Sequence, residues 1–499
     1  MSALAVDVGT SVVKAVAFAD DGTETALVRR TTRTLRPNPG WAEQDMDAVW
    51  QAVLAAVRGL PAEQRAAASF LAITGQGDGC WLVDDAGRPT GPAVLWSDGR
   101  AGDIVERWRT EGVLAEAFTI NGSLGFSGLP HAILAWLAGH DPERLRRSAT
   151  ALSCDGWVFS QLTNRVAVDR SDASAPFLDI RDGGYSARLR QLFGLEWAER
   201  LLPPVLDGAD RVATLTPQAA AALGLPADLP VVMAPYDLVS TAVGAGAVAP
   251  GQGSVILGTT LCAQTVRDTV DTSGEAAGLT IGLDGGQVLR AFPTLAGTEV
   301  LTWAGSLLGV DHPADFGRLA AAAPPGSRGL LFLPYLSPAG ERAPFLDPAA
   351  SGSFWRLTLE HTRADVARAV LEGLTHVIRD CLRAAGIGTT EIRLCGGGAR
   401  GEVWRQLIAD VTGVPVVSPA DSEVGAKGAF LAGLVATGAV PDLATAADRY
   451  VRLATPAAPD PVRAGFYAAH HEEFRQVREL ASAGWQRIRA TPTPWSGSD

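Results

Sequence analysis

The chain has 499 residues, of which 47% are hydrophobic and 19% are charged. This length predicts two or three domains that each bury a core, and the composition excludes a disordered chain. Lysine and arginine total 42 against 54 aspartates and glutamates, and the resulting net charge of −12 argues against non-specific binding to nucleic acid.

The first thirty residues alternate in the manner of β-strands. We expect strands over Ala3–Val8, Val12–Phe18 and Thr25–Arg30. Apolar residues at helical spacing then predict a helix over Asp45–Leu60, which Pro61 ends. Helix-like and strand-like segments continue to alternate, which predicts an α/β architecture.

A second start lies near residue 250. Ser254–Leu257 is an apolar strand that ends in Gly258-Thr259-Thr260, as the first strand ends in Gly9-Thr10. This weak internal likeness predicts two similar domains, residues 1–245 and 246–499, with a cleft between them. We expect a long helix over Ala464–Arg489 at the end of the second domain.

The composition also predicts where the protein works. Five scattered cysteines without a C-x-x-C pair are typical of a reducing compartment. No uncharged apolar run approaches the roughly 18 residues that cross a bilayer. The apolar stretch at the amino terminus has no basic segment before it. We therefore expect a cytoplasmic protein with no membrane and no nucleic-acid partner.

Asp7-Val8-Gly9-Thr10 marks the first candidate site. A carboxylate where a strand turns can hold Mg²⁺, the glycine lets the backbone approach a phosphate, and the threonine hydroxyl can donate to that phosphate. An ordinary hairpin turn uses the same residue types, so both interpretations stay open.

Gly396–Gly401 satisfies the pattern G-x-G-x-x-G between an expected strand, Glu391–Cys395, and an expected helix, Glu402–Thr412. With Asp421 further on, the pattern is compatible with dinucleotide binding. Glycines that lead into the amino terminus of a helix also suit any phosphate or adenine nucleotide, or a tight turn alone.

Two common nucleotide motifs are absent from the sequence. Lys14 and Lys427 are the only lysines, and neither stands in a Gly-Lys-Ser/Thr loop. The strand lysine and H-R-D loop of protein kinases cannot be assembled either.

Two acidic residues suit chemistry on a hydroxylated ligand. Asp237 closes an apolar strand, where a carboxylate can accept a proton from a substrate hydroxyl or can simply cap a helix. Gln76-Gly77-Asp78-Gly79, followed by Trp81, combines a carboxylate and an aromatic ring in one loop. That pairing suits a polyhydroxylated ligand, and a plain Asp-Gly turn is the alternative.

The histidines predict no metal site. His470 and His471 are adjacent on an amphipathic helix and cannot share one face, and His361 and His376 are a helix's length apart.

Taken in chain order, these segments resemble the FGGY family of carbohydrate kinases over nearly the whole chain. The segments that carry the resemblance are Asp7–Ser11 with Lys14, Trp96–Arg100, Gly253–Thr260, Gly340–Pro344, Arg363–Gly373, and Leu394–Arg400 running into Trp404, Gln406 and Asp410.

The resemblance implies an α/β chain of two actin-like (ribonuclease H-like) domains flanking a nucleotide and substrate cleft. It implies ATP, Mg²⁺ and phosphoryl transfer to a hydroxyl of a sugar or polyol, with Asp237 as catalytic base and Asp7 as the magnesium-linked carboxylate. The nucleotide residues that it implies are Thr10, Ser11, Lys14, Gly258, Thr259, Thr260, Gly397, Gly398 and Ala399. The acceptor residues that it implies are Gln76, Asp78, Trp81, Asp98, Arg100 and Asp237. A homodimer is common in the family.

Departures from the family pattern bear on the substrate. Xylulose kinases usually carry Met-His where this chain has Gly77-Asp78, and Asn where it has Leu238. The loop resembles the erythritol kinase branch instead, yet the Lys-Asp pair expected before Trp157 is replaced by Asp155-Gly156. An erythritol-type polyol is the favoured acceptor, and xylulose, another pentulose or a tetrulose is the alternative.

Two other classes of protein stay as remote alternatives. An NAD-linked oxidoreductase would explain the glycine pattern at residue 396 but not the two Gly-Thr turns. A non-catalytic actin-like ATP-binding module would have no use for Asp237 as a hydroxyl-directed base.

Overall fold

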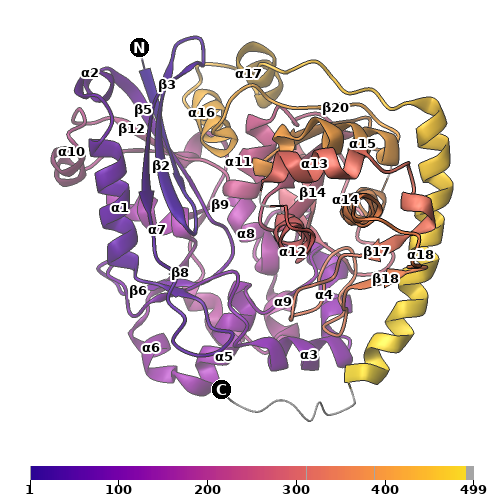
Figure 1. The fold of residues 1–499 in the computed structure, drawn as a ribbon. Helices are drawn as coiled ribbons and strands as arrows, with labels where there is room; N and C mark the ends of the chain where they lie inside the picture. Colours follow the sequence, from indigo (N-terminus) through magenta and orange to yellow (C-terminus); the bar gives the residue numbers. More distant parts are fainter. Residues whose placement is uncertain (1, 311, 387, 490–499) are drawn as a thin grey trace. The chain divides into compact units, whose positions relative to one another are not determined.

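The computed structural model describes residues 2–310, 312–386 and 388–489. The chain forms two compact units, and each draws on separate stretches of sequence (Figure 1). Unit 1 comprises Met1–Pro250, Val266–Arg290 and Pro419–Arg452, and unit 2 comprises Gly251–Thr265, Ala291–Ser418 and Leu453–Asp499. The domain division predicted at residue 245, and the cleft, stay predictions.

The core of unit 1 is a sheet in the order β11-β12-β5-β1-β2-β3. β1, β2 and β3 form an antiparallel meander, whereas β1, β5 and β12 run parallel to one another. The sheet strands are β1 (Ser2–Val8), β2 (Val12–Ala19), β3 (Glu24–Thr31), β5 (Ala68–Gly75), β11 (Val212–Thr214) and β12 (Pro230–Met233).

Shorter strands and the helices complete unit 1. The short strands are β4 (Glu43–Gln44), β6 (Trp81–Val83), β7 (Ala93–Val94), β8 (Thr150–Leu152), β9 (Val168–Asp169), β10 (Val205–Leu206) and β15 (Leu279–Gly282). The helices are α1 (Met46–Arg58), α2 (Ala62–Ala66), α3 (Gly102–Thr110), α4 (Val113–Asn121), α5 (Pro130–His140), α6 (Pro142–Arg147), α7 (Cys154–Thr163), α8 (Arg170–Phe177), α9 (Ala187–Leu192), α10 (Pro217–Leu223), α11 (Asp237–Gly244), α16 (Val424–Ala436) and α17 (Leu443–Tyr450).

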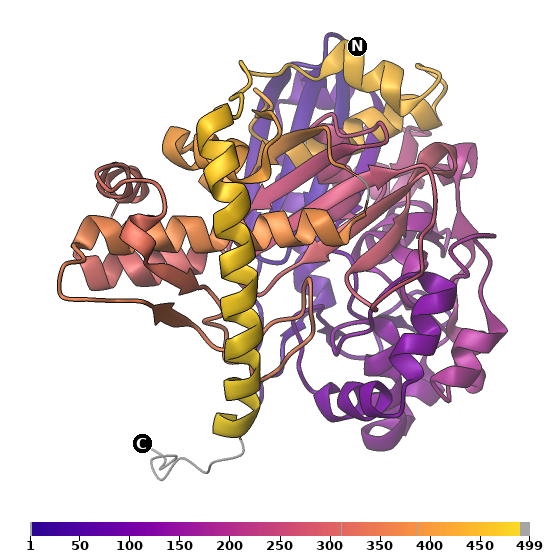
Figure 2. The ribbon, with the colours of Figure 1, turned by 90° about the vertical axis from the view of Figure 1, so that its right-hand side faces the viewer.

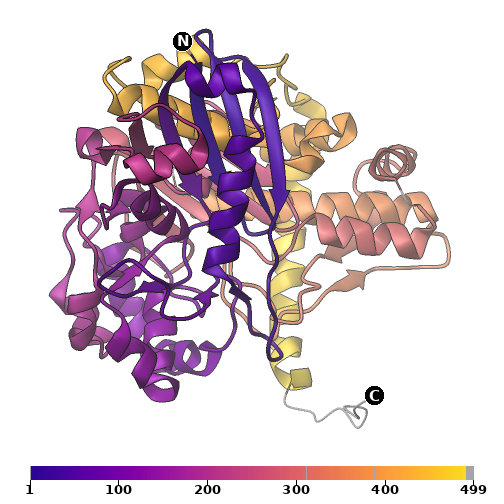
Figure 3. The same ribbon diagram turned by 90° about the vertical axis from the view of Figure 1, so that its left-hand side faces the viewer.

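Helices cover both faces of this sheet, and the alternation of side chains along each strand decides which residues meet which helix. α1 covers one face, where it shares a core with Leu4, Val6 and Ala17, and Figure 3 shows it in front of the strands. On the other face Phe18, next to Ala17, stacks on Phe430 of α16 with ring centroids 4.7 Å apart. The sheet is therefore buried on both sides, which matches its continuous apolar strands.

Close packing of α11 against α16 sets the position of α11. A Cβ added at Gly428 would lie 1.7 Å from the carbonyl oxygen of Ser240, and one added at Gly244 would lie 1.9 Å from that of Val424. Only glycine fits at these two crossings, so the backbones of the two helices are in contact there.

We expect Gly428→Ala to lower the free energy of unfolding by about 1–3 kcal/mol, because the new methyl group forces the two backbones apart. Gly139→Ala in α5 is the matched control, since nothing lies within 4 Å of its added Cβ, and it should stabilise by at most about 1 kcal/mol. Thermal unfolding of both variants checks this, and equal midpoints would contradict the close packing.

Unit 2 contains its own sheet, in which β14, β13, β19 and β20 are neighbours in that order. β13 pairs antiparallel with β14 and parallel with β19. The strands are β13 (Gln252–Leu257), β14 (Leu261–Arg267), β16 (Val288–Pro293), β17 (Leu331–Leu333), β18 (Ser353–Trp355), β19 (Glu391–Cys395) and β20 (Val416–Val417), of which β14 and β16 each cross a limit of the unit. The helices are α12 (Thr298–Leu308), α13 (Pro313–Ala321), α14 (Arg363–Ala384), α15 (Glu402–Thr412) and α18 (Pro461–Arg489).

α14 and α18 are the long helices of unit 2, and Figure 2 shows them crossing. Three histidines meet at this crossing. His376 Nε2 lies 2.9 Å from His470 Nδ1, and His376 Nδ1 lies 3.2 Å from His471 Nδ1. Packing between the two helices thus brings together histidines that are far apart in sequence. Among the described residues, no group of three or more His, Cys, Asp or Glu side chains is arranged to hold a metal ion.

Most elements predicted from sequence are confirmed, with ends that are unchanged or shifted by one to three residues. The helix expected over Asp45–Leu60 is α1, with the Asp45 side chain accepting from Ala48 N as its amino-terminal cap. In the part of the chain that the structure describes, no helix is long and apolar enough to span a membrane.

Candidate active site

Unit 1 places its candidate residues where three parallel strands end. Asp7 of β1 is in register with Thr74 of β5, and Val232 of β12 is in register with Ala72 of β5. Because the carboxyl ends of parallel strands meet at one edge, the turn after β1, the loop after β5 and the helix after β12 are neighbours. Asp7 lies near the end of β1, Gln76 to Asp78 lie in the loop after β5, and Asp237 begins the helix after β12.

The turn after β1 is tied to the loop after β5 through Thr10. Its hydroxyl donates to Gln76 Oε1 at 2.8 Å and accepts from Trp96 Nε1 at 3.0 Å. Its carbonyl oxygen accepts from Gln44 Nε2 at 2.6 Å. The structure thus uses Thr10 to position Gln76 and Trp96, while Ser11 beside it is exposed. The predicted contacts of Thr10 and Ser11 with phosphate stay predictions.

Asp7 lies in a chain of charges. Lys14 Nζ is 3.4 Å from Asp7 Oδ2 and 3.1 Å from Glu423 Oε2, and Glu423 also pairs with Arg29. Burial raises the pKa of Asp7 although Lys14 opposes the shift, and the pKa of Lys14 is raised because its two carboxylate partners outweigh its burial. A Cβ added at Gly425 would lie 3.2 Å from Asp7 Oδ2, so a side chain there would crowd Asp7.

The loop after β5 is shaped by a ring that lies on a glycine. A Cβ added at Gly77 would lie 1.9 Å from the ring of Tyr236, the residue before Asp237. Asp78 follows in the left-handed region with φ of 56°, a strained conformation for a residue with a side chain. Gly77 and Tyr236 therefore pack the loop after β5 directly against the start of α11.

Asp237 is the first residue of α11, and a buried polar chain holds the backbone just before it. Ser171 Oγ accepts from Tyr236 N at 3.0 Å, and Asp169 in turn accepts from Ser171 N at 2.7 Å. Arg211, 1% exposed, lies 3.6 Å from Asp169 Oδ2. Sequence reasoning missed this support, because nothing in the sequence around residue 171 indicates a contact with residue 236.

The environment of Asp237 favours its neutral form. Burial raises the pKa of Asp237 well above its ordinary value, and the negative charges of Asp7, Asp78 and Asp155 raise it further. A carboxylate whose pKa lies nearer to neutrality is a better match for proton transfer at physiological pH. The arrangement therefore suits a general base.

Three residues that were predicted to bind the acceptor, Asp98, Arg100 and Trp81, contact other protein side chains. Arg100 forms a bidentate pair with Asp98 at 2.8 and 2.9 Å and also reaches Glu43 at 2.7 Å. Trp81 has no exposed surface and stacks on Trp157 within the core. The burial of Trp81 therefore does not support direct contact between its ring and an acceptor. Trp96, half-buried beside Thr10, is the aromatic residue at the strand ends.

Unit 2 repeats the placement of loops at parallel strand ends. Gly258-Thr259-Thr260 follows β13, and the glycines from Gly396 follow the neighbouring β19. Gly396 has φ of 89° and Gly398 packs on Leu257 and Trp404, so the two segments lie side by side. The predicted nucleotide residues Gly258 to Thr260 and Gly397 to Ala399 are therefore brought together, with Thr259 and Gly397 exposed.

A buried carboxylate supports the turn after β13. Glu341, 1% exposed, accepts from Leu295 N at 2.6 Å and from Ala296 N at 3.2 Å. The same loop then packs Gly297 against Thr259, where an added Cβ would lie 1.9 Å from the carbonyl oxygen. Glu341 thus fixes the segment against which the turn rests.

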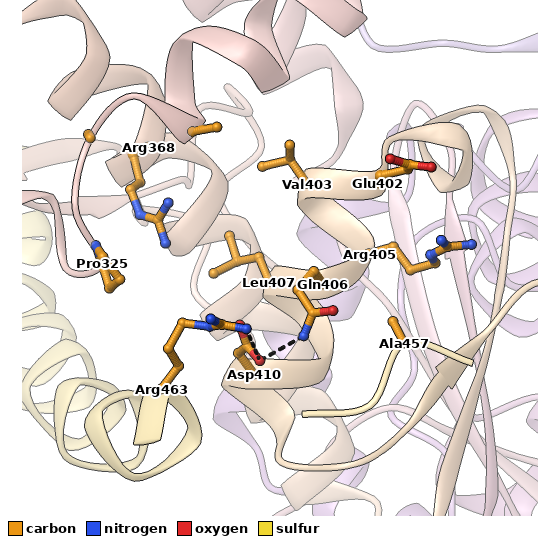
Figure 4. A pocket seen from close by; sticks show the side chains of 12 residues that line it. Pro325, Arg368, Glu402, Val403, Arg405, Gln406, Leu407, Asp410, Ala457 and Arg463 are labelled. Atoms are coloured by element: carbon orange, nitrogen blue, oxygen red, sulfur yellow. Dashed lines mark hydrogen bonds and ion pairs between the residues drawn. The ribbon is translucent and has the colours of Figure 1, made fainter. Parts of the chain in front are cut away.

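A pocket of about 640 Å³ lies elsewhere on unit 2, along α15 (Figure 4). Gln406 and Arg463 both point to Asp410 in the close view, and Gln406 Nε2 donates to Asp410 Oδ1 at 2.9 Å. Gln406 and Asp410, which belong to a segment of the family resemblance, therefore line this pocket and bind each other.

The fold and these strand-end loops define an α/β protein of the actin-like class, as predicted. A ligand-bound xylulose kinase from Lactobacillus acidophilus has the same fold, with a TM-score of 0.92 at 23% identity over 98% of this chain and 99% of that chain. Residues 2–244 match the N-terminal domain, and residues 253–437 the C-terminal domain, of the FGGY family of carbohydrate kinases.

Individual relatives agree with this match. An erythritol kinase from Brucella abortus (strain 2308) is 33% identical over 97% of this chain and 97% of its own length. An L-xylulose/3-keto-L-gulonate kinase from Escherichia coli (strain K12) is 31% identical over 87% of this chain and 88% of its own. The chain belongs to the FGGY family of carbohydrate kinases, and the prediction of a carbohydrate kinase is confirmed.

Family membership leaves the oxidoreductase interpretation without support. The acid that it required, Asp421, belongs to unit 1 and lies 3.3 Å from Lys427, whereas the glycines belong to unit 2.

Asp155, which stands where the erythritol kinase resemblance implies a lysine, is fully buried at the start of α7. Burial raises the pKa of Asp155 from 3.8 to about 6. The folded protein therefore keeps this proton up to higher pH than the unfolded chain, so the contribution of Asp155 to stability falls as pH rises from about 4 to above 6.

We expect Asp155→Asn to stabilise the protein by about 1–3 kcal/mol at pH 7.5, because the neutral amide removes the cost of a buried charge. The gain should shrink at pH 4.5, where Asp155 is protonated in the folded state. Thermal unfolding at both pH values checks this against Asp103→Asn, a change at an exposed position on α3. The same shift at both pH values would contradict the raised pKa.

Proposed function

We propose that the protein transfers the γ-phosphoryl group of ATP to a hydroxyl of a small polyol or ketose, with an erythritol-type polyol as the favoured acceptor. The observation that carries this proposal is the position of Asp237, a half-buried carboxylate of raised pKa beside the Gln76 to Asp78 loop. The similarity to an erythritol kinase over 97% of the chain supports the choice of acceptor. A pentulose is the second candidate, because the name of the Escherichia coli relative includes L-xylulose.

In this proposal Asp237 takes the proton of the acceptor hydroxyl while that oxygen bonds to the γ-phosphorus and the bond to the leaving ADP oxygen breaks. Phosphoryl transfer asks little more of a protein than positioning and charge neutralisation. Gln76 and Asp78 would orient the acceptor hydroxyls. Gly258 to Thr260 and Gly397 to Ala399 would hold ATP through backbone N–H groups and the threonine hydroxyls.

The residues of unit 1 fit a magnesium ion. Asp7 raises the pKa of Asp237, so the two carboxylates lie within electrostatic reach, and Lys14 offsets only part of their charge. Mg²⁺ commonly uses one or two protein carboxylates, with water and phosphate oxygens completing its shell. Asp7 would hold the ion, and the bound ion would offset the negative charge of the phosphates. Location in the cytoplasm and a homodimer stay predictions.

The proposal is tested by ADP release from Mg-ATP with erythritol, xylitol, arabinitol, erythrulose, xylulose and ribulose. We expect one strong responder among these uncharged acceptors. ATP hydrolysis that is slow and the same with every compound would contradict the proposal and favour a nucleotide-binding module.

With that acceptor, Asp237→Asn should reduce kcat by about 10²–10⁴-fold, the usual contribution of a general base, and leave the affinity for ATP unchanged. Asp103→Asn serves again as the matched control and should retain activity. Turnover of Asp237→Asn above roughly one per cent of wild type would mean that another residue is the base.

A further inference from the structure

Two buried carboxyl groups lie together in unit 1. Asp155 occupies the first turn of α7 and has no exposed surface, and Asp172 occupies the first turn of α8. Among the described residues, no N–H or hydroxyl group donates to Asp155 Oδ2 or to either carboxylate oxygen of Asp172. The two carboxyl groups are within hydrogen-bonding reach of each other when one of them is protonated. We call Asp155 and Asp172 the acid pair.

The acid pair adjoins the loop that is proposed to bind the acceptor. A Cβ added at Gly75 would lie 3.4 Å from the Cβ of Asp155, so Asp155 rests against the last residue of β5, one position before Gln76. Asp172 and Asp78 line the same small cavity of about 50 Å³. The charge of Asp155 also acts on Asp237. The pair therefore lies beside the loop that is proposed to bind the acceptor, and within electrostatic reach of the proposed base.

Nearby cations are already paired with other carboxylates. Arg211 lies between Asp169 and Asp284, and Lys14 lies between Asp7 and Glu423. In the described part of the chain no arginine, lysine or histidine forms an ion pair with Asp155 or Asp172. The negative charge of the pair is therefore balanced by a shared proton and not by a protein cation, since two adjacent carboxyl groups cannot both ionise readily.

We propose that the acid pair selects an uncharged acceptor and rejects one that carries a carboxylate. A pair that shares one proton offers a donor and several acceptor oxygens, and a hydroxyl group needs both kinds of partner. A substrate carboxylate would instead add like charge beside Asp155, Asp172 and Asp78 in a poorly solvated site. Like charges brought together in this way oppose binding strongly.

This inference rests on the proposed kinase function and adds a charge rule to it. The rule separates this chain from relatives that act on sugar acids, such as the Escherichia coli enzyme whose name includes 3-keto-L-gulonate. The rule follows from residues of this chain, because Asp155, Asp172 and Asp78 bring three carboxyl groups to one place.

The test compares acceptors that differ only in charge. We would measure kcat/KM with Mg-ATP for erythritol against erythronate, and for xylitol against xylonate, using the full chain. Wild type should favour the uncharged member of the better pair by at least about 100-fold. Asp155→Asn and Asp172→Asn should each narrow this preference by about tenfold or more, chiefly by raising kcat/KM for the acid. Asp103→Asn should leave the preference as in wild type.

Each result decides between the two claims. Equal turnover of acid and polyol by wild type, or an unchanged preference in both pair variants, would overturn the inference while the kinase function stands. Loss of activity toward both acceptors in Asp155→Asn, with no change in their ratio, would give the pair a structural role only and also overturn the inference. Absence of turnover with every acceptor would overturn the kinase proposal and the charge rule together.

Discussion

The parallel pairing of β1, β5 and β12 is the constraint on which the site of unit 1 depends. Because these strands run in the same direction and in fixed register, the segments that follow them meet at one edge. Asp7 and Asp237 are 230 positions apart in sequence, yet the negative charge of Asp7 helps to raise the pKa of Asp237. A shift of one residue in β1 would turn Asp7 to the opposite face of the sheet. The glycine contacts between α11 and α16 then fix where the helix that begins with Asp237 can lie.

The same geometry creates an electrostatic cost that the protein bears at its site. Asp7, Asp155, Asp172 and Asp237 all have raised pKa values, chiefly because each is removed from water. Lys14 offsets part of this charge at Asp7, and the amino terminus of α11 favours negative charge at Asp237. The proposed chemistry uses the negative charge that remains. This charge raises the pKa of the proposed base, attracts a cation and repels an acceptor that carries a carboxylate. Perturbed carboxyl groups of this kind are typical of functional sites.

The local features of the fold, such as strand ends, could be predicted from the sequence, whereas few contacts between distant residues could. Strand ends at Gly9-Thr10 and Gly258-Thr259 were predictable, because glycine and threonine after an apolar run indicate where a strand stops. The contacts of Arg100 with Asp98 and the burial of Trp81 could not be predicted. These residue types are typical of binding loops, and only the packing of the structure shows that other protein side chains contact them. Asp172 and the meeting of His376 with His470 were missed for the same reason. Neither has a sequence neighbour that indicates its partner, since the contact joins separate helices.

The most direct test of this account is the pH dependence of kcat/KM for the best acceptor, in wild type and in Asp155→Asn. The account predicts that activity falls on the acidic side as Asp237 is protonated, and that this limb moves to lower pH in the variant. Loss of the negative charge of Asp155 removes one cause of the raised pKa of Asp237. An acidic limb at the same pH in both proteins would contradict the electrostatic coupling on which the proposed roles of Asp237 and the acid pair depend.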